Sequence, residues 1–104
     1  MRFRNSFWPR LGREESERTQ LVIWRVREAM LFALDEYVSK NKRALETRVL
    51  VACDLDELWF LRTEIMYAIA ASRDEIVARE CLTQITSLFI GHYPGASPSR
   101  FGAF

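Results

Sequence analysis

The chain has few of the residues that form metal sites or disulfide frameworks. Its 104 residues include one histidine, two cysteines, four glycines and three prolines. Zinc needs cysteine or histidine ligands at close spacings, whereas Cys53 and Cys81 are far apart and His92 is the sole histidine. A secreted disulfide framework would use more cysteines. We therefore expect no metal and two reduced cysteines that are small core residues in helical segments, with one disulfide as the alternative.

The sequence also lacks the motifs of common enzyme classes. It contains no Gly-x-Ser-x-Gly, and its glycines at 91 and 95 follow a predicted helix, whereas a phosphate-binding loop precedes one. Its adjacent acids fit helix starts or a solvated helix face, with no apolar surroundings that would raise a carboxyl pKa. These pairs are Glu14–Glu15, Asp35–Glu36, Asp56–Glu57 and Asp74–Glu75. We expect a non-enzymatic protein without a cofactor.

Long hydrophobic runs and a strong charge of one sign are missing as well. The apolar run 29–34 is far too short to span a bilayer, and no apolar stretch follows the basic start as in a secretory signal. The net charge is +1, although residues 1–13 hold four arginines and no acid. We expect a cytoplasmic chain that is not transmembrane, and its net charge does not favour binding of nucleic acid.

The chain is rich in hydrophobic residues, which make up 49% of the total and are spaced as in amphipathic helices. We predict an all-α fold, a small bundle of about four helices with a long first helix, in a single domain over residues 1–104. Pro9 and Gly12 oppose a helix at the start, and the end is rich in proline, glycine and serine. The predicted elements are a basic aromatic arm 1–12, helices 13–39, 42–53, 55–71 and 73–90, and an extended tail 92–104.

Capping residues set the predicted helix boundaries. Asp54 and Glu57 have N-cap and N3 spacing, and Ser72-x-x-Glu75 has the form of a capping box. Gly91 supplies the position after a helix where a left-handed residue costs least. A fresh turn beginning at Thr63 could break the third helix near Arg62.

The first helix carries an inward heptad seam, with apolar residues at spacings of three and four. The seam is Ile23, Val26, Met30, Ala33 and Tyr37. A helix over 13–39 would be about 40 Å long, whereas a compact domain of this size is about 26–30 Å across. We expect either a kinked helix or an elongated bundle.

The first and third helices hold more apolar residues than one buried face needs. We interpret the additional residues as a subunit interface, most simply of a two-fold homodimer. The candidate interface residues are Leu21, Trp24, Leu31, Phe32, Trp59, Phe60 and Tyr67. The competing interpretation is a monomer in which both helices are central and the tails cover the remaining apolar surface.

The leading functional hypothesis is an interaction or adaptor protein whose terminal segments dock a protein partner. The candidate docking arm combines arginine with aromatic residues, namely Arg2, Arg4, Phe7 and Trp8. One alternative is a small-molecule sensor or carrier with an apolar pocket between helices. Its candidate lining is Met30, Met66, Trp59 and Phe60. A third hypothesis is contact of the basic arm with a membrane surface or nucleic acid.

Overall fold

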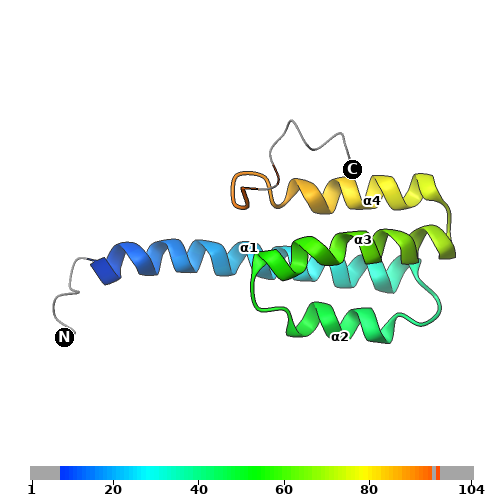
Figure 1. The fold of residues 1–104 in the computed structure, drawn as a ribbon, viewed down its shortest axis with the longest axis horizontal. Coiled ribbons are helices and arrows are strands. Elements are labelled where there is room, and N and C mark those ends of the chain that lie inside the picture. Colours follow the sequence, from blue (N-terminus) through cyan, green and yellow to red (C-terminus); the bar gives the residue numbers. More distant parts are fainter. Residues whose placement is uncertain (1–7, 95, 97–104) are drawn as a thin grey trace.

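The protein folds into four α-helices (Figure 1). The computed structural model describes the backbone of residues 8–94 and 96, and side chains from residue 16 onward. The helices are α1 (Trp8–Tyr37), α2 (Arg43–Val51), α3 (Leu55–Ser72) and α4 (Glu75–Ser87). The described residues include no strand, and α1 is the longest helix. The predicted all-α class is therefore confirmed.

Helix α1 begins earlier than predicted. It starts at Trp8, so residues 8–12 of the predicted irregular arm are helical. Pro9 stands in the first turn, where a missing N–H costs no hydrogen bond, and a helix tolerates Gly12 at a cost of about 1 kcal/mol. After Tyr37 the chain turns through Asn41, which has a φ of 57°. Asparagine is one of the few residues that adopts this left-handed conformation readily.

Elongation, one of the two outcomes expected for a long first helix, is what the structure shows. The 30 residues of α1 span about 45 Å, and the molecule measures 54 × 31 × 16 Å along its principal axes. Figure 1 shows the first half of α1 projecting beyond the other helices. Residues 16–21 are all exposed, and Val22 is the first buried residue among the described side chains.

Asp54 caps α3 as its spacing predicts. Its Oδ1 accepts a hydrogen bond of 2.9 Å from the backbone N–H of Glu57, and Glu57 Oε1 accepts one of 2.6 Å from the Cys53 N–H. This reciprocal pair satisfies donors that a helix start leaves without partners. Helix α3 runs without interruption to Ser72, as the predicted helix 55–71 implies, and the alternative of a break near Arg62 does not occur.

The predicted capping box at Ser72 is also wrong. Ser72 is the last residue of α3, and the N-cap of α4 is Asp74, whose Oδ1 accepts from the Val77 N–H at 2.8 Å. Helix α4 ends at Ser87 instead of continuing to residue 90. Turns follow to residue 92, and Gly91 has the left-handed φ of 88° expected of it.

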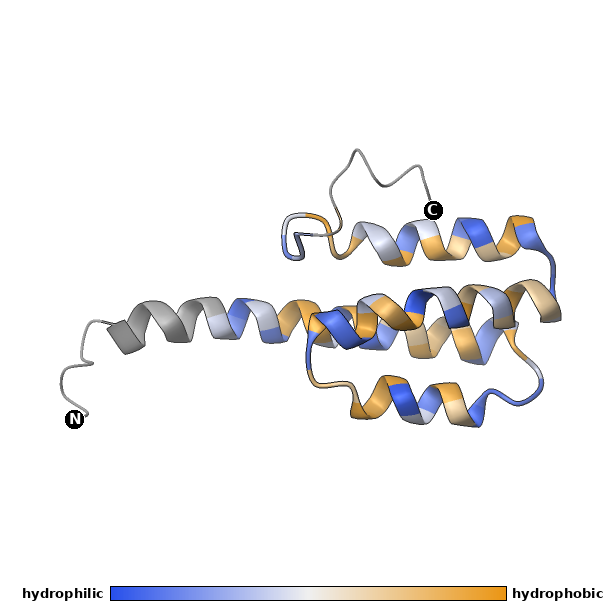
Figure 2. Cartoon of the chain, viewed as in Figure 1, coloured by the Kyte–Doolittle hydropathy of each residue, from blue (hydrophilic) through white to orange (hydrophobic). Residues whose placement is uncertain are grey.

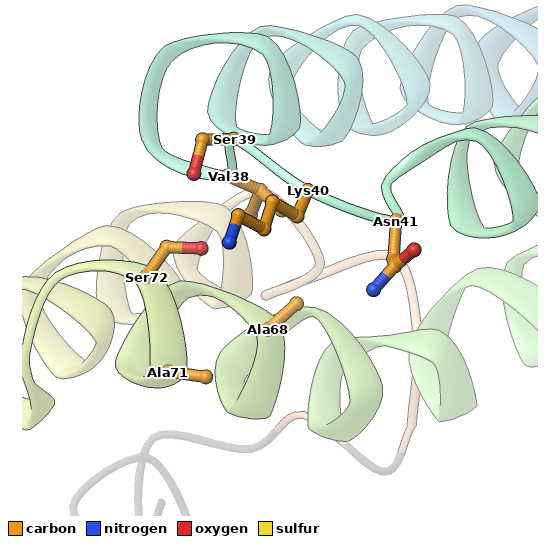
Figure 3. A pocket seen from close by; sticks show the side chains of 7 residues that line it. All are labelled: Val38, Ser39, Lys40, Asn41, Ala68, Ala71 and Ser72. Atoms are coloured by element: carbon orange, nitrogen blue, oxygen red, sulfur yellow. The ribbon is translucent and has the colours of Figure 1, made fainter.

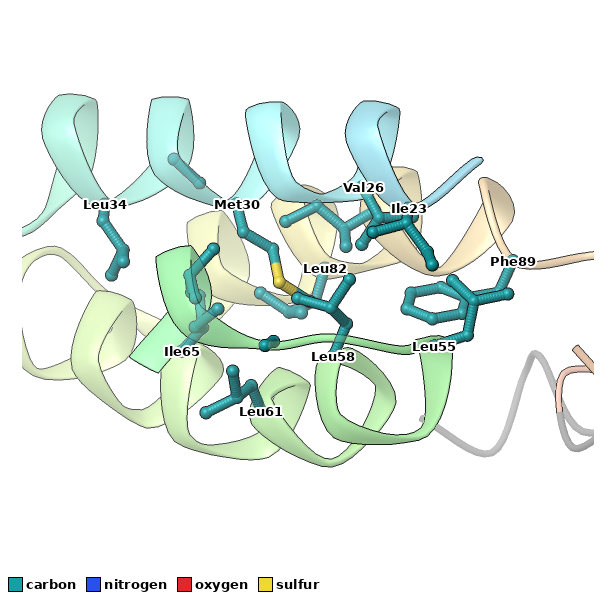
Figure 4. Packing of buried hydrophobic residues seen from close by; sticks show 14 of the residues in the cluster. Ile23, Val26, Met30, Leu34, Leu55, Leu58, Leu61, Ile65, Leu82 and Phe89 are labelled. Atoms are coloured by element: carbon teal, nitrogen blue, oxygen red, sulfur yellow. The ribbon is translucent and has the colours of Figure 1, made fainter. Parts of the chain in front are cut away.

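The core lies between α1 and α3, with α2 and α4 packed along their two flanks (Figures 1 and 4). The predicted seam of α1 is buried from Ile23 to Ala33, and Tyr37 is half-buried. Met30 of α1, Ile65 of α3 and Leu82 of α4 are completely buried and point into this core (Figure 4). Each such side chain contributes about 1.5–3 kcal/mol to folding through removal from water.

Arg27 fixes α2 against α1. Its guanidinium donates to the carbonyl oxygens of Val49, at 3.3 Å, and Ala52, at 2.7 Å. These carbonyls lie at the C-terminal end of α2, where a cation is favourable. Figure 2 shows the hydropathy change along the described side chains of α1, from hydrophilic residues to hydrophobic ones where the bundle begins.

Candidate interaction surface

Five of the seven candidate interface residues are exposed. Helix α1 presents three of them, Leu21, Trp24 and Phe32, with 47%, 55% and 66% of their surface accessible. Helix α3 presents the other two, Phe60 and Tyr67, at 70% and 65%. Leu31 is half-buried beside the core. Contiguous exposed apolar patches mark interaction sites, whereas apolar residues scattered singly over a surface are ordinary, so what matters is how these residues are grouped.

These residues form two separate faces. Helices α1 and α3 pack against each other through their buried sides. A side chain on the opposite side of either helix therefore points away from the other helix. The outer face of α1 holds Leu21, Trp24 and Phe32, and the outer face of α3 holds Phe60 and Tyr67, which are two helical turns apart.

Trp59 packs inside the monomer. Its ring lies 5.0 Å from that of Phe89 and 4.9 Å from that of Tyr93, measured between centroids. Both partners belong to the segment after α4, and Phe89 is fully buried. His92–Ala96 was expected to be part of an extended tail, but Tyr93 is half-buried and Ala96 is buried. The chain after α4 therefore returns to cover Trp59, which belongs to neither outer face.

Arg62 is a buried cation that joins α3 to α4. It donates from Nη1 to Thr86 Oγ1 at 3.0 Å and from Nε to the Trp59 carbonyl at 3.1 Å. Its guanidinium also lies 3.4 Å from the Trp59 ring centroid. Burial lowers the pKa of Arg62 to about 10, which leaves it charged at neutral pH. The sequence feature that could have identified Arg62 as buried is its position on the inward stripe of α3, between Leu58 and Ile65.

Three more large apolar residues are exposed that the sequence analysis did not assign to a surface. Leu50 and Val51 end α2, and Ile76 stands in the first turn of α4, with exposed fractions of 57%, 65% and 68%. Each is adjacent in the sequence to a buried or half-buried residue, so hydrophobicity alone does not distinguish it from a core residue.

The two cysteines differ in environment. Both are free, so the alternative of a disulfide is wrong in this structure. Cys53 was expected inside a helix but lies exposed in the link between α2 and α3. Cys81 is half-buried in α4, and desolvation raises its pKa.

The described part of the chain includes two open grooves. The first, of about 540 Å³, lies between α1 and α4 and is lined mostly by apolar residues, including Ala29, Phe32, Val77 and Leu88. The second, of about 510 Å³, lies between the link 38–41 and the last turns of α3 (Figure 3). None of Met30, Met66, Trp59 and Phe60, the candidate pocket residues, lines either groove.

The remaining observations concern metals, membranes and the terminal arm. No three histidine, cysteine, aspartate or glutamate side chains within the described residues are placed to share a metal ion. The same residues include no helix with the length and hydropathy needed to cross a bilayer. Arg2, Arg4 and Phe7 of the candidate docking arm lie outside the described residues, and Trp8 begins α1.

Comparison with known proteins finds no matching family model, no similar curated protein and no similar solved structure.

Proposed function

We propose that this protein is a non-enzymatic interaction module that acts as a homodimer. The observation that supports the proposal most is the outer face of α1, where Leu21, Trp24 and Phe32 remain about half exposed or more although the monomer has a complete core. Aromatic residues are enriched among the energetic anchors of interfaces. The proposal includes a cytoplasmic location, where the free thiols of Cys53 and Cys81 stay reduced.

Light scattering after size-exclusion chromatography tests the homodimer. We expect a dimer at micromolar concentration for the native chain, and a monomer for the double variant Trp24→Ser/Phe32→Ser. The matched control is Phe60→Ser/Tyr67→Ser, which removes two exposed aromatic side chains from the other outer face and leaves the dimer intact. A native chain that elutes as a monomer would contradict the proposal.

The outer face of α3 and the terminal arm remain for a different protein partner. Phe60 and Tyr67 lie on one face of α3, away from α1, and the arm adds Arg2, Arg4, Phe7 and Trp8. Pull-down with the full chain and with a variant lacking residues 1–8 tests the arm. Recovery of the same proteins by both would show that the arm does not dock the partner.

A second candidate function is a carrier or sensor of a small apolar molecule. The groove between α1 and α4 supports it, since about 540 Å³ is within the range of ligand sites. A ligand of this groove should raise the melting temperature of the native chain but not of Ala29→Phe, which fills the groove. The absence of any shift across a panel of apolar metabolites would count against this candidate.

A further inference from the structure

The outer face of α1, opposite the buried seam, presents a stripe that combines charged and apolar side chains. Positions 18, 21, 25, 28, 32 and 35 recur at alternating spacings of three and four, so they follow one side of the helix, with two apolar residues among four charged ones. All six side chains are exposed. We call this set the outer stripe. Its residues in chain order are Arg18, Leu21, Arg25, Glu28, Phe32 and Asp35.

We infer that the outer stripe is the dimer contact, and that two copies of α1 pair antiparallel about a two-fold axis between Arg25 and Glu28. This inference rests on the proposed homodimer and adds its geometry. A two-fold axis there brings Arg25 of one copy opposite Glu28 of the other, and the reciprocal pair forms by symmetry. The same register brings Leu21 opposite Phe32, and Arg18 opposite Asp35.

Charge complementarity selects this register over its neighbours. Sliding one copy by a heptad would bring either Glu28 opposite Phe32 or Leu21 opposite Arg25, so that a charge would meet an apolar side chain. Parallel pairing would bring Arg25 opposite Arg25 and Glu28 opposite Glu28. Such juxtapositions of like charge cost several kcal/mol and suppress the wrong geometry.

The monomer leaves these charges available for a partner. No ion pair in the described residues involves Arg25 or Glu28, and Asp35, which pairs with Lys42 at 3.2 Å, is still 79% exposed. Beside the stripe, Trp24 and Leu31 stand seven residues apart on one side. In the antiparallel pair, Trp24 of one copy lies next to Leu31 of the other, which covers apolar surface that the monomer exposes.

The shape of the molecule permits this contact. Helices α2, α3 and α4 pack on the inner and lateral sides of α1, and the outer stripe stays open along its length. Residues 18–35 extend over about 26 Å, or five turns. Such a contact lies at the small end of specific interfaces, which bury about 1,200–2,000 Å². We therefore expect a dissociation constant of the order of micromolar.

Charge reversal tests the register. We expect Arg25→Glu and Glu28→Arg each to weaken self-association by about tenfold or more in sedimentation velocity, because four like charges then meet at the axis. An equimolar mixture of the two variants should associate as the native chain does, because every pair at the axis is then complementary. The matched control is Arg43→Glu, which reverses an exposed charge on α2 and should leave association unchanged.

Disulfide cross-linking gives a second measurement, in a Cys53→Ser/Cys81→Ser background. A mixture of Leu21→Cys and Phe32→Cys chains should form a cross-linked dimer. Neither variant should do so alone, since two copies of position 21 would lie about 16 Å apart. A native dimer that both charge reversals leave intact would overturn this register but not the homodimer. A native chain that stays monomeric would overturn both.

Discussion

Arg62 is the residue whose role differs most from what its type suggests. Buried arginines are rare, and this one keeps its charge by donating to Thr86 and the Trp59 carbonyl while it stacks on the Trp59 ring. Both contacts lie where α3 meets the end of α4. Its long side chain therefore helps to join these two helices as well as to fill the space between them.

Replacement of Arg62 should destabilise the fold. We expect Arg62→Ala to lower the free energy of unfolding by about 2–4 kcal/mol, because it removes buried packing and charged hydrogen bonds. Chemical denaturation followed by circular dichroism measures this loss. Arg43→Ala, at an exposed position of α2, should change stability by less than about 0.5 kcal/mol. Equal effects of the two substitutions would show that the Arg62 contacts do not form.

The two thiols should react at different rates. The thiolate is the reactive form, and the pKa of Cys81 is raised by desolvation while Cys53 is exposed. At neutral pH we expect a thiol reagent to modify one site per chain quickly and the other slowly, with the slow phase accelerating as pH rises. Cys53→Ser should remove the fast phase. A fast phase that survives this substitution would contradict the exposed position of Cys53.

At the scale of the elements, the helix starts show which boundaries the sequence specifies and which it leaves open. Asp54 was predicted as a cap from its N-cap and N3 spacing with Glu57, and that pair of hydrogen bonds forms. Two candidates compete at the next helix start, and Asp74 prevails because Ser72 is still within the last turn of α3. From the sequence, Pro9 was expected to oppose a helix. Helix α1 includes it because a proline in the first turn interrupts no hydrogen bond.

The caps give a direct comparison at this scale. We expect Asp74→Ala to destabilise the protein by about 1 kcal/mol, because the N–H of Val77 loses its acceptor. Ser72→Ala should have an effect close to zero. The urea concentrations at the midpoints of unfolding of the two variants measure these effects. A larger loss of stability for Ser72→Ala than for Asp74→Ala would show that Ser72 is the cap.

At the scale of the whole molecule, periodicity predicts the helices and the α1 seam but not which of the remaining apolar residues become covered. Trp59 and Phe60 are adjacent in the sequence and equally apolar in type. Trp59 is covered by Phe89 and Tyr93 from the segment after α4, while Phe60 stays exposed. That contact joins residues about thirty positions apart, which no local pattern reveals. For the same reason, the sequence did not predict that the candidate interface residues divide between two outer faces.

We propose that the outer face of α1 is a dimer contact and not incidental apolar exposure. The most direct measurement is sedimentation equilibrium of the unmodified chain from about one to one hundred micromolar, a range that brackets a micromolar dissociation constant. We predict that the average mass rises with concentration from the 12.2 kDa of one chain toward twice that value. A mass that remains at 12.2 kDa over the whole range would contradict the homodimer.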